Sequence, residues 1–463
     1  MLTAALASAS ASAKWNRDST EYDSFDRFRV GGYGELVAAF KNYGINRFNG
    51  TQQGNSHIHR GTISIPRFTI AGDYKWNRRW RLGMEIEFEN GGTGTVYELE
   101  NTENGEYETE IEKGGEVVLE QLHITYSPSP HFNLQLGHMV LPVGTWNIYH
   151  EPMNYLSTVR PEGETSLVPA SWHETGISLF GQFGRKWASF QWAAMVTEGL
   201  NANGFDRNNW VNPGKQGLFE DDNFTSPAYT ARLSYSGIPG LTVGGTFYYC
   251  ANAASNSDKP QTYGFRVPVR IWIADARYSN TWLTATANLL RGNLGNSAAL
   301  TGRNVKLSNN SPYTRTAPIA HKAACYGVEA GLKLKGLVDG RRMPDLIPFF
   351  RYEYYNAQQQ VDAPYVADNR LKTSLWTAGI NYRPHPVIII KADYTKRRIG
   401  EGAFNNENEF ALGVAFAGWF FSDRTMSDRK AKQSIDRHQQ TIDRMNQRLE
   451  QMQQQIDELK NRR

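Results

Sequence analysis

Between residues 28 and 421 the chain is a series of about sixteen segments in which apolar and polar residues alternate, and this alternation limits the folds open to it. In the segment 79–89, RWRLGMEIEFE, Trp80 and Met84 lie on one side of the alternation, and Arg81 and Glu85 lie on the other. Alternation with a period of two residues is typical of β-strands, because successive side chains point to opposite faces of a sheet. We therefore predict an all-β fold over this range.

The links between these segments alternate strictly between short and long. Short links such as SPSP, GRK and GIPG follow the even-numbered segments. The links after odd-numbered segments are rich in Asn, Gly, Glu and Asp and reach about thirty residues. A compact water-soluble domain rarely holds so many long irregular loops. Bacterial outer-membrane barrels have tight periplasmic turns, long external loops and an even number of strands. We therefore predict that residues 28–421 form a 16-stranded antiparallel transmembrane β-barrel.

A barrel of this kind explains how a chain with a mean hydropathy of −0.56 can enter a membrane. Lipid offers no hydrogen-bond partner to the backbone, so the sheet must close on itself. The apolar faces then contact lipid and the polar faces line a lumen. Aromatic residues near segment ends, such as Trp80, Tyr126 and Trp419, suit the girdles found at membrane interfaces. The predicted partners are outer-membrane lipid and lipopolysaccharide.

The alternation also predicts which charged residues line the pore. They are Arg81, Glu85, Glu87, Arg232, Arg266, Arg270, Glu329, Lys333, Arg351, Glu353, Lys391 and Asp393. Rings of fixed charge are how pores select ions. Because this predicted lining mixes acids with bases, we expect weak ion selectivity. Arg266 and Arg270 either pass an anion along one strand or pair with acids on neighbouring strands.

The C-terminal segment has a different periodicity, with apolar residues at the a and d positions of successive heptads. The predicted coiled-coil core is Ile435, Ile442, Met445, Leu449, Met452, Ile456 and Leu459. Such a repeat is typical of a left-handed coiled coil. The e and g positions are mostly uncharged, which favours pairing with identical chains, and a homotrimer is expected. The alternative is a single amphipathic helix lying on another protein or on a membrane.

The first residues predict secretion. Residues 1–13 are small and apolar and end in Ala-Ser-Ala, which suits a signal peptide, although the usual positive charge at its start is missing. The alternative is a truncated or misassigned start. Residues 14–27 would then form a periplasmic N-terminal segment. An even number of strands places both ends of the barrel on the same side, so residues 424–463 are expected to form a periplasmic coiled coil.

Several stretches resemble the phosphate-selective porin O and P family of Gram-negative bacteria. They include ISIPRFTIAGDYKWNRRWRLGMEIEFENGGTG, LQLGHMVLPVG and RPEGETSLVPASWHETGISLFG. The resemblance implies a 16-stranded trimeric pore whose third external loop, here about 142–172, folds inward as a constriction. Arg160, Glu162 and Glu164 are the predicted constriction residues; alternatively they form salt bridges to the wall or lie in a surface loop. In the family the coiled coil is N-terminal, whereas here it is C-terminal. Because acidic residues are also predicted to face the pore, we do not extend the phosphate selectivity of the family to this chain.

These observations predict an outer-membrane porin for passive diffusion of small hydrophilic solutes or ions. The alternative is a structural tether whose coiled-coil tail binds peptidoglycan or a periplasmic partner. The chain has no motif of a nucleophilic hydrolase or of a nucleotide-binding loop, so no enzyme activity, metal or cofactor is expected. The 50 basic and 46 acidic residues are nearly balanced, so no nucleic-acid partner is expected.

Overall fold

The computed structural model describes residues 27–42, 59–92, 95–100, 108–113, 115–216, 221–306, 317–337, 343–401 and 405–424, together with Gln439 and Met445. The predicted signal segment 1–13 and nearly all of 14–27 lie outside the described residues. So do most residues of the predicted coiled-coil core, namely Ile435, Ile442, Leu449, Met452, Ile456 and Leu459.

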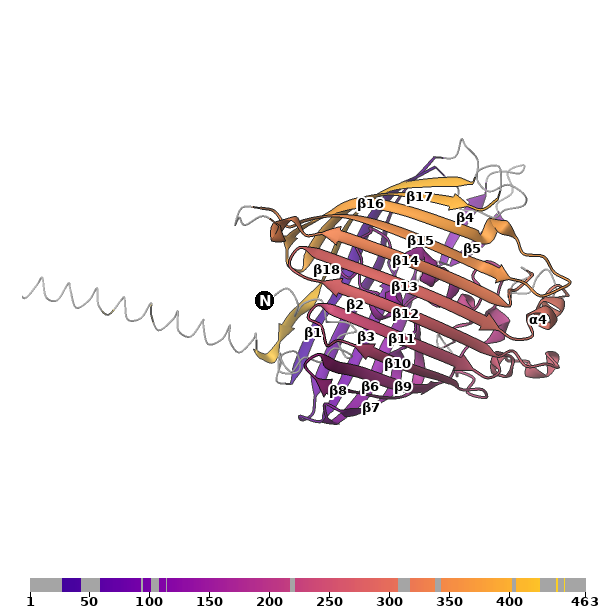
Figure 1. Ribbon diagram of the computed structural model, residues 1–463, viewed down its shortest axis with the longest axis horizontal. Coiled ribbons are helices and arrows are strands. Elements are labelled where there is room, and N and C mark those ends of the chain that lie inside the picture. The colour runs from indigo at the N-terminus through magenta and orange to yellow at the C-terminus, as the bar shows by residue number, and fades with distance from the viewer. Residues whose placement is uncertain are drawn as a thin grey trace, which may run out of the picture.

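Sixteen of the described strands form one closed antiparallel barrel (Figure 1). They are β1 (Phe28–Lys41), β2 (Arg60–Lys75), β3 (Trp80–Glu89), β6 (Glu116–Ser129), β7 (Phe132–Val140), β8 (His173–Arg185), β9 (Ala188–Thr197), β10 (Ala228–Tyr235), β11 (Leu241–Cys250), β12 (Val269–Ser279), β13 (Leu283–Leu294), β14 (Lys322–Leu332), β15 (Leu346–Gln360), β16 (Lys372–His385), β17 (Ile388–Ile399) and β18 (Asn406–Ser422). Neighbours along the chain pair with one another, and β3 pairs with β6. The ring closes where β1 pairs with β18, from Arg29 opposite Ser422 to Lys41 opposite Glu409.

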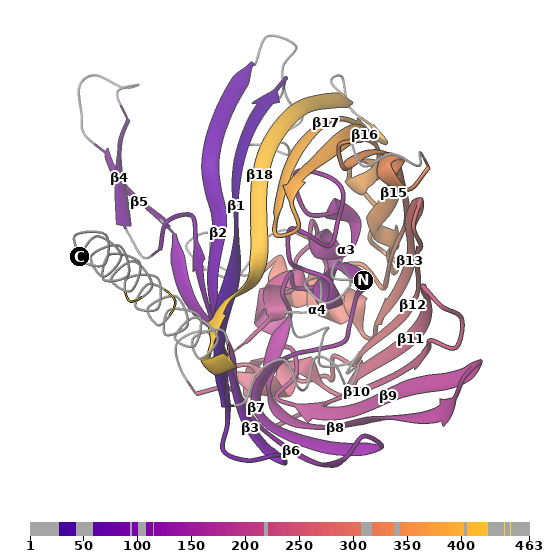
Figure 2. The same cartoon turned by 90° about the vertical axis from the view of Figure 1, so that its left-hand side faces the viewer.

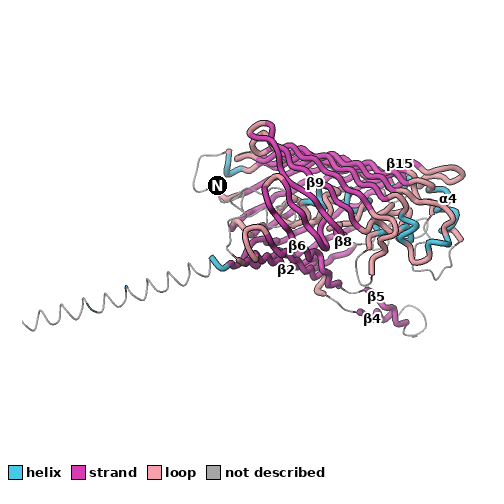
Figure 3. Tube along the Cα trace, turned by 90° about the horizontal axis from the view of Figure 1, so that it is seen from below, coloured by secondary structure: helices cyan, strands magenta, loops and turns pink. Residues whose placement is uncertain are grey.

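Each of the sixteen predicted segments is a barrel strand. The prediction missed a separate hairpin in the long link between β3 and β6, formed by β4 (Thr95–Glu100) and β5 (Glu108–Lys113). This hairpin stands away from the barrel wall (Figures 2 and 3). A two-stranded ribbon that packs on neither face of the main sheet leaves little pattern to separate it from an irregular loop.

The described helices are short and lie in the links between strands. They are α2 (Thr145–Ile148), α3 (Glu162–Leu167), α4 (Ser297–Asn304) and the 3₁₀ turns η2 (Ala202–Gly204), η3 (Asn212–Gly214), η4 (Ala253–Asn256), η5 (Pro260–Thr262), η6 (Leu334–Gly336) and η7 (Asn369–Leu371). In the described part of the chain, no helix is both long and apolar enough to cross a membrane.

The two rims of the barrel differ in the way the alternating links predict. The start of β1 and the end of β18 lie at the rim of the short turns, and the long links lie at the opposite rim (Figure 1). Exposed aromatic side chains gather next to the short turns, at Trp76, Trp80, Phe132, Trp187, Trp282, Tyr382 and Phe420. A ring of aromatics at one end of a barrel is what an interface between water and lipid favours.

The outer face of the barrel carries large apolar side chains. Exposed examples are Leu36, Ile70, Met84, Ile86, Leu122, Ile124, Leu233, Leu289, Val328, Phe350, Ile380, Ile390, Leu412 and Val414. They come from strands all around the ring, so the exposed apolar surface is a belt rather than a patch. Exposed apolar surface on this scale marks contact with lipid or with another protein.

The interior is not an empty tube. At the end of the long links, side chains from 139–143, 167–172 and 200–211 join those from β11, β12 and β13 in one buried apolar cluster. Trp210 is wholly buried in it, and its indole ring lies over Gly292 of β13, where a Cβ atom would come within 2.0 Å of the ring. The loops on this side of the barrel therefore fold inward and fill part of the space that the ring encloses.

Candidate functional site

The loop between β7 and β8, residues 141–172, crosses the inside of the barrel. Near its start, the carbonyl of Pro142 accepts a hydrogen bond from Thr246 Oγ1 in β11 at 2.8 Å. In its middle, Tyr155 donates to Glu35 Oε2 in β1 at 3.1 Å, and the carbonyl of Leu156 accepts from the amide of Asn381 in β16 at 2.9 Å. Contacts with such separate strands place the loop across the interior, where Figure 2 shows α3 enclosed by the ring.

Carboxylates on the wall accept hydrogen bonds from the backbone of this loop. The amide of Leu156 donates to Glu329 Oε1 at 3.2 Å, and the amide of Gly163 donates to Glu353 Oε1 at 3.1 Å. The amide of Thr158 donates to Asp393. Buried backbone amides need such partners. These predicted lining residues therefore lie on the inner face, where they hold the loop rather than face open water.

Lys391 of β17 holds the same loop through its carbonyl groups. Its Nζ donates to the carbonyls of Pro152, Tyr155 and Ser157 at 2.6, 2.9 and 2.9 Å. The amine also lies 4.3 Å from the centre of the Tyr155 ring. Three acceptors use all three donors of an ammonium group, so this buried cation is fully paired.

Two arginines of the predicted lining form ion pairs within the wall. Arg351 binds Glu329 through Nε at 2.9 Å, and Arg232 binds Asp275 with two parallel hydrogen bonds of 2.7 and 2.9 Å. Paired guanidinium and carboxylate groups of this geometry are among the stronger polar contacts in proteins. The charges of these four side chains cancel locally.

The three predicted constriction residues have different environments. Glu162 is half-buried at the start of α3, where it binds Arg397 of β17 at 3.1 Å and accepts from Tyr355 at 2.5 Å. Arg160 is also half-buried and donates to Ser171 Oγ at 3.0 Å. Glu162 therefore ties the loop to the wall by a salt bridge, as one of the sequence alternatives expects, whereas Arg160 bonds within the loop; both keep some exposure.

Glu164 does not face open space. It is 1% exposed and accepts a hydrogen bond from the backbone of Trp146 at 2.8 Å, within the loop itself. Burial raises the pKa of its carboxyl. Its contact therefore joins α3 to α2, and the prediction that it lies at the constriction surface is wrong.

The prediction that Arg266 and Arg270 line the pore is also wrong. Both side chains are exposed, whereas Val267 and Val269 between them are wholly buried in the apolar cluster. Arg270 lies on the outer face, with its guanidinium 5.5 Å from the centre of the Tyr249 ring. Alternation shows which residues share a face of a strand. It does not show whether the apolar face contacts lipid or an apolar cluster inside the barrel. In β12 the apolar face turns inward, because the infolded loops form such a cluster there.

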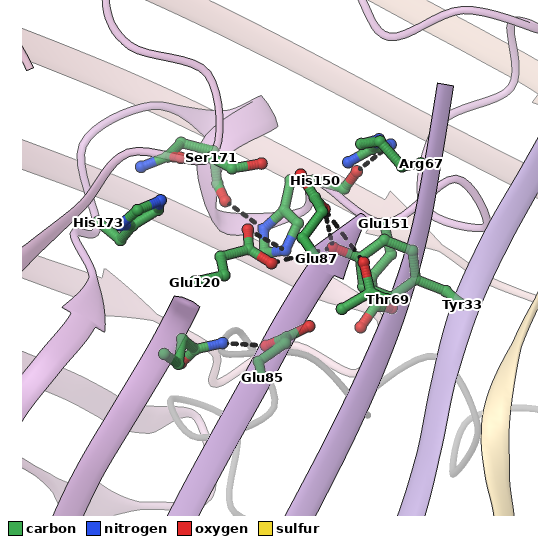
Figure 4. A network of polar contacts seen from close by, with 12 residues as sticks. Tyr33, Arg67, Thr69, Glu85, Glu87, Glu120, His150, Glu151, Ser171 and His173 are labelled. Carbon is green, nitrogen blue, oxygen red and sulfur yellow. Dashed lines mark hydrogen bonds and ion pairs between the residues drawn. The ribbon is translucent and has the colours of Figure 1, made fainter. Parts of the chain in front are cut away.

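The other predicted lining residues lie on the inner face. Glu87 accepts from Tyr33 at 2.9 Å and from Thr69 at 3.1 Å (Figure 4). Arg81 is buried and lies 4.0 Å from Asp73. Glu85 is buried and accepts a hydrogen bond from Gln121. Lys333 is half-buried near the short-turn rim and donates to the carbonyl of Asn280 at 2.9 Å.

Arg67 is an inner-face residue that the sequence prediction missed. It lies in β2, binds Glu35 through Nε at 3.0 Å, and donates to the Tyr155 hydroxyl and to the carbonyl of His150, both at 3.1 Å. The signal was present, because Arg67 alternates with the apolar residues Phe68 and Ile70 that face outward.

Comparisons with known proteins support the fold. No family model matches the chain. An uncharacterized protein of Aquifex aeolicus (strain VF5) is 24% identical over 371 residues, which cover 79% of this chain and 75% of that protein. Among solved structures, OmpF of Salmonella typhi in complex with daunomycin superimposes with a TM-score of 0.50 at 12% identity, over 86% of this chain and 99% of that one. The chain therefore shares the 16-strand barrel fold of outer-membrane porins.

Two further structures are similar at lower scores. The outer membrane channel DcaP of Acinetobacter baumannii has a TM-score of 0.49 at 13% identity, covering 84% of this chain and 96% of that one. OprB of Pseudomonas putida has a TM-score of 0.48 at 10% identity, covering 85% of this chain and 94% of that one.

Proposed function

We propose that this chain is an outer-membrane porin that lets small hydrophilic solutes or ions diffuse passively, with the infolded loop 141–172 as its constriction. One observation carries the proposal. A closed barrel with an apolar belt outside holds a loop across its interior, and the loop is fixed to several separate strands by hydrogen bonds to charged side chains. A fixed obstruction inside a membrane barrel excludes solutes by size without any chemical step.

The charges described along the inner wall support weak ion selectivity. Arg232 forms an ion pair with Asp275, and Arg351 forms one with Glu329. Arg397 forms a third ion pair with Glu407, at 3.0 Å. The half-exposed charged groups include cations such as Arg160 and Arg277 and the anion Glu162. Because these described arginines are paired with acids, we do not propose phosphate selectivity, despite the sequence resemblance to a phosphate-selective family.

The assembly and orientation of the chain form part of the proposal. We expect both termini on the periplasmic side, because the start of β1 and the end of β18 share the rim of the short turns. The heptads after residue 424 would then join three chains beneath a homotrimer, with residues 1–13 acting as the signal peptide. The same tail is the basis of the alternative, a tether to peptidoglycan or a periplasmic partner.

Recording from purified protein in planar lipid bilayers tests the channel. We expect stepwise current increases, in groups of three if the chain is a trimer, and a reversal potential near zero in a salt gradient. Complete absence of steps from protein that is folded and inserted would refute the channel, and strong anion selectivity that saturates with phosphate would refute the weak selectivity.

A chain that lacks residues 424–463 separates the two roles of the tail. Loss of the trimer on this deletion, measured by light scattering in detergent, supports the coiled coil as an assembly element. Unchanged assembly and conductance with a weakened cell envelope supports the tether instead.

A further inference from the structure

Two acidic residues and one histidine meet where the infolded loop touches the wall. Glu85 comes from β3, Glu120 from β6 and His150 from the loop (Figure 4). One ligand atom from each of the three lies within 4.8 Å of the other two. Their exposed fractions are 4%, 1% and 0%, so the cluster is closed to bulk water.

A β-bulge brings the second carboxylate into this cluster. Glu85 pairs with Gln121 and the next residue, Ile86, pairs with Leu119, so Glu120 is an extra residue in β6. Glu120 and Gln121 are consequently both buried, although they are adjacent in the chain. A bulge redirects a side chain that regular pairing would place on the opposite face, and bulges are frequent next to functional sites.

Each of the three side chains is oriented by a hydrogen bond through its other polar atom. Tyr33 donates to Glu120 Oε2 at 3.2 Å, and Gln121 donates to Glu85 Oε2. His150 Nδ1 lies 2.8 Å from the carbonyl of Asn147. Since a carbonyl only accepts, Nδ1 carries the proton and Nε2 presents its lone pair to the cluster. Outer contacts of this kind orient the ligands of metal sites.

Two of the inward atoms have no hydrogen-bond partner among the described residues. They are His150 Nε2 and Glu120 Oε1, which lie 3.4 Å apart. Two lone pairs that face each other in a buried site call for a positive species between them. Either a metal ion or a proton shared by the two groups fulfils this requirement.

The charges around the cluster are of both signs. Arg67 is paired with Glu35, and Glu87 lies beside Glu120 on the wall. Arg160 and Lys215 are the other cations that act on Glu120 electrostatically. A divalent ion bound to two carboxylates would leave the three-ligand cluster neutral, which offsets the cost of burying two acids side by side.

We propose that Glu85, Glu120 and His150 form a binding site for a divalent transition-metal ion of the zinc class, which cross-links the infolded loop to β3 and β6. An imidazole together with two carboxylates suits zinc and its neighbours, whereas calcium and magnesium prefer ligand sets made only of oxygen. Three protein ligands leave a fourth position open on a tetrahedral ion. The inference stands independently of any transport function.

Metal analysis of the purified full-length protein in detergent tests the site. The protein is first treated with a chelator, then incubated with zinc chloride and desalted, and bound zinc is measured by mass spectrometry and by titration calorimetry. We expect a single tightly held zinc ion per chain, which is lost in Glu120→Gln and in His150→Gln. Tyr33→Phe keeps the three ligands and removes one outer contact, so zinc affinity should fall by roughly 10- to 100-fold.

Matched controls distinguish this site from surface binding. His131→Gln and Glu401→Gln change exposed residues of the same types and should retain the ion. Cobalt in place of zinc gives a second readout, because visible absorption of a nitrogen-ligated ion should disappear in His150→Gln. Thermal unfolding without metal confirms that each variant is folded. The proposal is overturned if folded wild-type protein retains no ion, as expected for a shared proton, or if Glu120→Gln and His150→Gln bind zinc as the wild type does.

Discussion

The side-chain amine of Lys391 donates to the carbonyl of Tyr155 across a sequence separation of 236 residues, at 2.9 Å. It also binds the carbonyls of Pro152 and Ser157, so one cation on β17 holds three carbonyl groups of the loop that crosses the barrel. The loop is thus held mainly by its backbone, and side chains of the wall decide its position.

Replacing Lys391 with methionine should loosen the loop and leave the barrel intact. Each buried carbonyl that loses its only donor costs about 1–3 kcal/mol. We expect a lower unfolding temperature, faster proteolysis within 141–172 and greater noise in the open-channel current. Lys396→Met, on the exposed face of the same strand, is the matched control. Equal behaviour of the two variants would contradict the role given to Lys391.

Replacing Glu162 with glutamine should shift ion selectivity toward anions. Glu162 is half-exposed and pairs with Arg397, so its neutralisation leaves part of that guanidinium charge facing the loop. Arg397 retains Glu407, which limits the expected shift of the reversal potential to a modest one. Glu401→Gln, in an exposed link, should give the wild-type value. A reversal potential equal to that of the wild type would show that the pair does not face the permeation path.

Replacing Gly292 with alanine should destabilise the protein. The added Cβ would lie 2.0 Å from the indole ring of Trp210, which is wholly buried in the apolar cluster. Overpacking of this kind typically costs about 1–3 kcal/mol. Gly245→Ala is the control, because the nearest atom to its Cβ is 3.9 Å away. The comparison of unfolding temperatures should show a loss only for Gly292→Ala, with weaker near-ultraviolet dichroism from the displaced indole.

Glu198 should make stability decrease as the pH rises. Burial, followed by the charge of Glu174, raises the pKa of Glu198 from 4.5 to about 9. The folded state therefore binds more protons than the unfolded chain between about pH 4.5 and 9, so the free energy of unfolding falls as pH increases through that window. Glu198→Gln should reduce this slope in thermal unfolding measured across the range, whereas the exposed Glu401→Gln should preserve it. A slope that Glu198→Gln leaves unchanged would contradict the role given to Glu198.

The barrel could be predicted from the sequence because its signal is repeated in every strand. Alternation and link length are local properties, and the fold follows from them with little need of long-range information. The sequence could not predict in the same way which face of β12 points into the barrel. Val269 and Ile271 point inward only because distant loops supply an apolar surface inside the ring, and no feature of the strand itself distinguishes that surface from lipid.

The residues around the infolded loop show the same limit. Arg67 could have been found by alternation, since residues 67–70 of β2 alternate between buried and exposed. Glu120 could not, because the bulge that turns it inward is a matter of pairing between β3 and β6. The partners of Glu164 and Lys391 lie within or across the loop, and a strand pattern says nothing about how a loop of irregular structure enters a barrel.

The pairing of β1 with β18 has a consequence for biogenesis. The first barrel strand acquires its second neighbour only from the last one, so no partial chain emerging during synthesis can complete the ring. A product that stops before residue 406 would keep two unsatisfied sheet edges, and open edges promote association between chains. Closure of the ring therefore waits for the last strand, and the arrival of β18 is the step that removes both open edges at once.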